Sequence, residues 1–221
     1  VLFRSDDERA ALARGEGRRE DADVIFSTAI ASNVDLGETQ AKAFQQIRFR
    51  LSGVDLSGFQ LDGGRQSLEG DVLTVRREDW DAIAPGYGLP YKSMDLREAL
   101  QPEPLIQSDD PRIVQQARQM TAARASFSPD PKRVAEQLTR SVYGMLEKEI
   151  TISVPSALQV LDSRKGDCNE HTVLYVALAR ALGLPARTAV GLVYLRGAFY
   201  YHAWPEVWLG QWVAVEIGRA H

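Results

Sequence analysis

Two different periodicities of apolar residues divide the chain. In the first part, Ile47, Phe49 and Leu51 alternate with glutamine and arginine. A period of two residues is typical of a strand with one face in water. Several short segments of this kind, separated by turns that contain glycine and asparagine, predict a small antiparallel β domain over residues 24–84.

The segments on either side of this β domain lack a regular apolar period. Residues 6–23 are charged and predict a flexible lead-in. Prolines and glycines concentrate just after the β domain, so we expect a linker over residues 85–109.

From residue 110 onward the apolar period changes to that of a helix. Asp110 and Asp130 each stand directly before a proline, the arrangement of an N-cap followed by proline at the first helical position. In the second of these helices the apolar face holds Val134, Leu138, Val142 and Met145. A third, short helix is predicted from Ser156 to near Ser163.

A fourth predicted helix begins after Asp167, which is followed at capping-box distance by Glu170. It ends at Gly183, with Pro185 beyond. Its predicted core face holds Val173, Val176, Ala177, Ala181 and Leu182. Two strands follow, residues 186–195 and 199–207, joined by a turn at Arg196 and Gly197.

The only cysteine of the chain, Cys168, falls in the first turn of the fourth helix. Unpaired backbone N–H groups and the positive end of the helix dipole favour a thiolate there and can stabilise an oxyanion. His202 lies in the second of the two strands, on one face with Trp204 and Glu206. A cysteine at a helix start together with a strand histidine predicts a nucleophile and its base.

The register of the last hairpin predicts where a third catalytic group would lie. A three-residue turn over residues 208–210 would pair Val207 with Gln211 and place position 216 directly opposite His202. Glu206 is a poor substitute, since it lies roughly 13 Å from His202 along the strand.

Both ends of the sequence match translated sequencing-adapter DNA. We therefore expect residues 1–5, VLFRS, and residues 216–221, EIGRAH, to be scars of an untrimmed read, with no functional weight. In that interpretation Glu216 replaces the native residue, the catalytic core is truncated, and an N-terminal signal is not excluded, so localisation stays open.

The composition argues against a nucleic-acid-binding protein and against a membrane-spanning helix. The 221 residues are 44% hydrophobic and 25% charged, with a net charge of −4 and scattered basic residues, which argues against nucleic acid as a partner. No apolar run approaches the roughly 18 residues of a membrane-spanning helix. Nothing in the sequence indicates a cofactor or a bound metal.

Three separated motifs together resemble the core of bacterial transglutaminase-like domains. They are the run SALQVLDSRKGDCNEHTVLYVALARALGLPARTAVGLVY, then YHAWPEVWL, then WVAV, within residues 153–215. The resemblance implies an α+β, papain-like core over residues 110–215, in which a helical layer packs on an antiparallel sheet. It also implies a Cys-His-Asp triad that acts on protein or peptide substrates. Cys168 and His202 match two members, whereas Glu216 stands where the family has aspartate, so we expect this chain to be impaired.

Other interpretations remain open at the level of sequence. The family includes transglutaminases, peptidases and amidases, and related folds transfer acyl groups from coenzyme A. A catalytically silent binding module is a further alternative. A metal site of Cys168, His171 and His202 lacks a fourth ligand, and we expect His171 on the helix surface.

Four residues around the predicted site have two interpretations. Arg187, Tyr200, Tyr201 and Trp204 either line a substrate cleft or serve strand packing. Trp208 and Trp212 are expected to be structural aromatics of the hairpin.

Overall fold

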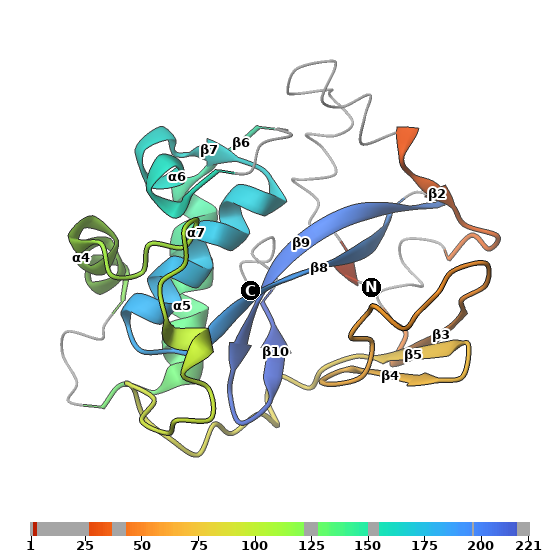
Figure 1. Ribbon diagram of the computed structural model, residues 1–221, viewed down its shortest axis with the longest axis horizontal. Coiled ribbons are helices and arrows are strands. Elements are labelled where there is room, and N and C mark those ends of the chain that lie inside the picture. The colour runs from red at the N-terminus through yellow and green to blue at the C-terminus, as the bar shows by residue number, and fades with distance from the viewer. Residues whose placement is uncertain are drawn as a thin grey trace.

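A computed structural model describes residues 2–3, 27–36, 43–121, 128–149, 155–195 and 197–215. It places a group of helices on one side of a twisted sheet and a smaller sheet on the other (Figure 1). The α+β fold class predicted from the sequence is confirmed. Within the described ranges, no helix is long and apolar enough to cross a membrane.

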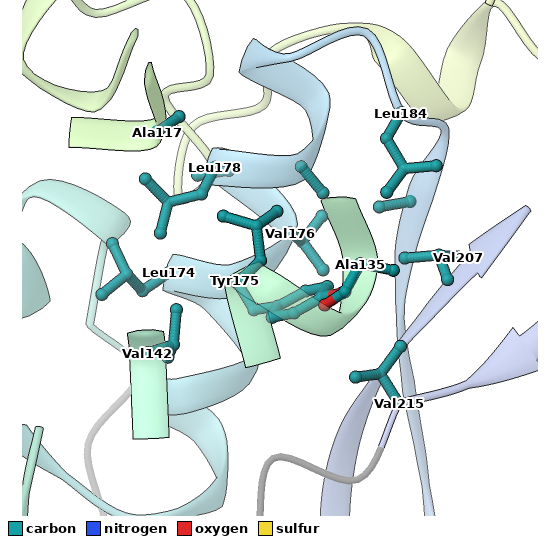
Figure 2. Packing of buried hydrophobic residues seen from close by; sticks show 14 of the residues in the cluster. Ala117, Ala135, Val142, Leu174, Tyr175, Val176, Leu178, Leu184, Val207 and Val215 are labelled. Atoms are coloured by element: carbon teal, nitrogen blue, oxygen red, sulfur yellow. The ribbon is translucent and has the colours of Figure 1, made fainter. Parts of the chain in front are cut away.

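Helix α7, Cys168–Ala181, is the centre of the fold. Helices α4 (Pro111–Met120), α5 (Pro131–Met145) and α6 (Ala157–Ser163) all pack against it, as do the sheet strands. Most of its residues are buried, not only those on the predicted face. In Figure 2, Leu174, Tyr175 and Leu178 project from it into the apolar cluster. The phenol of Tyr175 donates to the Ala135 carbonyl oxygen at 3.1 Å, which satisfies the one polar atom of that side chain.

The predicted helix starts are confirmed by their capping hydrogen bonds. The Asp110 carboxylate accepts from the Arg112 backbone N–H at 2.8 Å, and Asp130 accepts from that of Arg133 at 3.0 Å. Each is followed by proline at the first helical position. Ser156 caps α6 through a reciprocal bond with Gln159.

The larger sheet carries the strands that follow α7. Strands β8 (Ala186–Leu195) and β9 (Ala198–Trp208) form a long antiparallel hairpin, and β10 (Trp212–Ala214) pairs with β9. Strand β2 (Ile30–Ala31) pairs antiparallel with β9, whereas β1 (Leu2–Phe3) pairs parallel with β8. The sheet is therefore mainly antiparallel, as predicted, with one short parallel edge.

The predicted register of the last hairpin is wrong. Trp208 pairs with Trp212 and Val207 with Val213, so the loop consists of residues 209–211. The sequence predicted Val207 opposite Gln211, two positions away. The reason is burial: Leu209 is only 1% exposed and enters the core as the first loop residue, while Gly210 takes the left-handed conformation. The argument that aligned position 216 directly with His202 therefore loses its basis.

The smaller sheet is antiparallel and lies where the alternating pattern predicted strands. Its order is β3 (Gln46–Arg50), β5 (Val72–Arg76) and β4 (Gln66–Glu69). Phe49 of β3 packs edge-on against Phe199 of β9, with ring centroids 5.8 Å apart. A 3-10 helix, η1 (Glu98–Leu100), lies within the predicted linker. A two-stranded parallel pair, β6 (Glu147–Lys148) with β7 (Lys165–Gly166), was not predicted.

The end of α7 is fixed by a glycine that the sequence singled out. Gly183 has φ +75°, its N–H donates to the Arg180 carbonyl, and the Leu184 N–H donates to that of Ala179. These two bonds are those of a Schellman motif. A Cβ atom at position 183 would lie 2.3 Å from Cβ of Pro90.

We predict that Gly183→Ala lowers the free energy of unfolding by about 2–4 kcal/mol, because a left-handed alanine is strained and the added methyl group meets Pro90. Gly70→Ala is the matched control: Gly70 also has positive φ, but a Cβ there meets nothing within 4 Å. It should cost only about 1–2 kcal/mol. Urea denaturation of both variants measures the difference, and equal losses would contradict the contact with Pro90.

Candidate active site

Cys168 is the first residue of α7, and local contacts fix this helix start. The backbone N–H of Asp167 donates to the Glu170 carboxylate at 3.0 Å, which confirms the predicted capping-box spacing. Gly166 has φ +152°, and a Cβ there would lie 2.2 Å from Glu170. Only glycine lets the chain approach the capping carboxylate so closely.

The thiol of Cys168 is buried, with 7% of the residue exposed. It lies at the end of α7 where backbone N–H groups have no partner within the helix. These groups and the helix dipole favour negative charge on sulfur or on a nearby oxygen. The helix start therefore offers the electrostatic setting of a reactive thiol.

The prediction for His171 is wrong. It is 5% exposed, and its Nδ1 lies 2.7 Å from the Asp167 carbonyl oxygen one turn earlier. The prediction of a surface position assumed that α7 has an exposed face, whereas helices and sheet surround it. Among the described residues, no group of three or more His, Cys, Asp or Glu is placed to hold a metal ion.

His202 is buried in the middle of β9, where it pairs with Gly191 of β8. Its ring stacks on Trp204, with centroids 6.1 Å apart and an interplanar angle of 25°. The alternation along β9 places His202, Trp204 and Glu206 on one face, as the sequence predicted.

The neighbours of Cys168 and His202 in the chain are hydrogen-bonded to each other. Tyr201, which precedes His202, donates its phenol to Oδ1 of Asn169, which follows Cys168, at 3.1 Å. The pKa of Tyr201 is raised, first by burial and then by the charge of Cys168. The start of α7 and the middle of β9 therefore lie close together.

This link was not predicted, because a contact between a helix terminus and a strand leaves no periodic signal in a sequence. Of the four residues with two interpretations, Tyr201 is 48% exposed beside the helix start. Arg187 instead forms an ion pair with Glu206, with Nη2 and Oε2 2.7 Å apart. Strands β8 and β9 pair these two residues directly opposite each other. The turn that the sequence predicted at residues 196 and 197 implies the same pairing and could have revealed it.

Trp208 and Trp212 lie opposite each other in the last hairpin, with ring centroids 5.6 Å apart in an edge-on arrangement. The prediction that they are structural aromatics is confirmed. Glu216, the predicted third member of the site, lies outside the described residues.

The fold and the helix-start cysteine define a class of α+β domain in which a central helix packs on an antiparallel sheet. Comparison with protein families identifies it. Residues 115–217 match the model of the transglutaminase-like superfamily, and this match contains both Cys168 and His202. This part of the chain belongs to the transglutaminase-like superfamily.

One solved structure agrees with this assignment. The chain is similar to a candidate cysteine protease from Cytophaga hutchinsonii, with a TM-score of 0.52 and 25% identity over 67% of this chain. The match covers 52% of that protein, so the present chain spans about half of its length. The periplasmic domain of TgpA from Pseudomonas aeruginosa also matches, with a TM-score of 0.45 and 19% identity over 78% of this chain and 68% of that one. A search of curated proteins finds no match to this chain.

The contact between Tyr201 and the helix start leads to a pH-titration prediction. Cys168→Ser removes the thiol charge, so we expect the pKa of Tyr201 to fall while burial still holds it above the usual tyrosine value. The measurement is a tyrosinate absorbance titration of Cys168→Ser and of the parent, each corrected with the corresponding Tyr201→Phe variant. An unchanged Tyr201 titration would show that the thiol and the phenol are not neighbours.

Proposed function

We propose that this chain is a cysteine acyl-transfer enzyme in which Cys168 is the nucleophile and His202 is its base. The observation that carries the proposal is the hydrogen bond between Tyr201 and Asn169. It links the residues next to His202 and Cys168, and therefore supports a close approach of the middle of β9 to the start of α7. A buried thiol at the start of α7 supplies the nucleophile.

The proposed reaction proceeds in two acyl transfers. The Cys168 sulfur attacks the carbonyl carbon of a carboxamide or peptide bond, and a tetrahedral oxyanion forms. When the carbon–nitrogen bond breaks, the protonated His202 ring gives its proton to the leaving amine, and a thioester remains on Cys168. An amine or a water molecule then attacks the thioester, His202 takes up its proton, and the thiolate leaves.

The helix start serves the oxyanion in this scheme. Backbone N–H groups of the first turn of α7 point out of the helix end beside Cys168, the place where negative charge develops during attack. Removal of a single donor of this kind typically costs a factor of about 10² to 10³ in turnover.

Position 216, which Glu216 occupies in this chain, stays our candidate for the third group that orients His202. This assignment now rests on the resemblance of the sequence motifs, since the register argument for it is wrong. The family has aspartate at this position, and the longer glutamate side chain motivates the expectation of a low turnover.

We predict that Cys168 reacts with iodoacetamide faster than a free thiol does at neutral pH, because the helix end and a protonated His202 stabilise the thiolate. His202→Ala should slow the alkylation about tenfold. The rate is followed by mass spectrometry on the intact chain, in which Cys168 is the only cysteine. An alkylation rate that does not change in His202→Ala would disprove the ion pair.

A casein-type substrate then separates the possible reactions. Release of ammonia or of peptides without uptake of a labelled primary amine indicates hydrolysis, whereas uptake of the labelled amine indicates transamidation, and Cys168→Ala should abolish either one. If Cys168 alkylates rapidly but neither product forms above the level of Cys168→Ala, the chain does not transfer acyl groups from protein amides and the proposed reaction is wrong.

A further inference from the structure

Trp204 is the aromatic residue that packs on the proposed catalytic base. Its ring lies 6.1 Å from that of His202, centroid to centroid, with planes only 25° apart. We propose that Trp204, held by Glu206 and Arg187, is a positioning residue that fixes the orientation of the His202 ring. The inference rests on the proposed function and adds residues that act on the base without touching the substrate.

A chain of polar contacts holds the indole in place. The Nε1–H of Trp204 donates to Oε1 of Glu206 at 3.4 Å. The other carboxylate oxygen of Glu206 accepts from Arg187, from Nε at 2.8 Å and from Nη2 at 2.7 Å. Two donors from one guanidinium make a strong, directional bond. The ion pair with Arg187 therefore fixes the Glu206 carboxylate that accepts the hydrogen bond from the Trp204 indole.

The Arg187 guanidinium, which anchors these polar contacts, also packs against an aromatic ring. Arg187 lies over the ring of Trp212, 4.2 Å from the centroid. Its side chain is 38% exposed and that of Glu206 is 19% exposed. Partial burial and the aromatic neighbour reduce the freedom of this ion pair, in contrast to an ordinary surface salt bridge.

Contacts with two other segments confine the indole ring further. Arg65, from the segment before β4, lies over the ring of Trp204 at 5.9 Å and approaches Glu78 at 3.9 Å. On the neighbouring strand, a Cβ at Gly191 would lie 2.7 Å from Cη2 of Trp204. Gly191 is also the direct cross-strand partner of His202, so the indole occupies the space beside the histidine that a side chain would fill.

This arrangement explains how Glu206 contributes although it lies four residues from His202 in the strand. Rotation about the last side-chain bond of histidine is soft, so a free imidazole samples many orientations. The Trp204 ring, which stacks on the imidazole of His202, restricts this rotation because the indole is itself held in place. Small errors in the placement of a catalytic group cost about 10²-fold in rate, so the fixation matters for turnover rather than for substrate binding.

The chain contains a matched control for this Trp–Glu–cation arrangement. Trp80 also donates its Nε1–H to a glutamate, Glu136 on α5, at 2.8 Å, and a cation, Lys132, lies 5.6 Å from its ring. Its loss should affect stability in the same way as the loss of Trp204, without an effect on the base. Trp80→Phe and Trp80→Ala therefore report the purely structural cost.

The test compares Trp204→Ala, Trp204→Phe, Glu206→Leu and Glu206→Gln with the two Trp80 variants. Trp204→Ala should lower kcat about 10²-fold with KM changed less than about twofold, and should slow iodoacetamide alkylation of Cys168 towards the rate of His202→Ala. Phenylalanine at position 204 should restore most of the rate, because it keeps the stack. Glu206→Gln should act mildly, since its amide oxygen still accepts from the indole, whereas Glu206→Leu should approach Trp204→Ala.

The outcomes separate this inference from the proposed function. If His202→Ala does not slow alkylation, the proposed function fails. If His202→Ala slows alkylation but Trp204→Ala does not, positioning by Trp204 is wrong. It is also wrong if Trp80→Ala lowers the alkylation rate and kcat as much as Trp204→Ala does. Urea midpoints are measured for each variant, and if Trp204→Ala does not fold, the comparison of Glu206→Leu with Glu206→Gln decides in the same assays.

Discussion

Burial of α7 on all sides is the constraint on which the rest of the structure depends. Three other helices and a sheet cover α7, and this packing fixes the position of both helix ends relative to the surrounding elements (Figures 1 and 2). Arg180 adds a polar clamp near the C-terminal end. Its guanidinium donates to the carbonyl oxygens of Ala186 at 2.8 Å and Gln101 at 2.6 Å, and pairs with Glu103 at 2.7 Å.

From these fixed ends the location of the candidate site follows. The N-terminal end presents Cys168 beside a buried capping carboxylate. The C-terminal end passes through the Schellman motif directly into β8, and β9 runs back antiparallel to β8. A strand of about six residues covers nearly the length of a 14-residue helix, so the middle of β9 returns to the helix start. Tyr201 meets Asn169 there, with His202 next in the chain.

Local signals in the sequence were sufficient for much of this arrangement. The two N-caps predicted at Asp110 and Asp130, the Asp167–Glu170 box and the glycine at position 183 depend on contacts within a few residues, and all of them are present. The predictions that failed required knowledge of distant parts of the chain. The face of α7 that bears His171 is buried because other elements cover it, which no helical periodicity reveals.

The register of the last hairpin failed for a similar reason. Leu209 is drawn into the core, and the Tyr87 phenol, far away in the sequence, donates to the Trp208 carbonyl oxygen. Turn statistics favour common loops, but burial of one leucine stabilises by about 1.5–3 kcal/mol and decides between loops of similar intrinsic cost. The candidate cysteine and histidine could be predicted from a helix start and a strand, whereas the network around Trp204 needed the paired strands.

The central claim is that the start of α7 and the middle of β9 bring the Cys168 thiol and the His202 imidazole into one catalytic pair. The most direct measurement is a crystallographic distance, from Sγ of Cys168 to the nearer ring nitrogen of His202. The account predicts roughly 3–4.5 Å, the range of a thiol and its base at rest. A separation beyond about 8 Å in an intact fold would contradict it, since no change of side-chain rotamer closes such a gap.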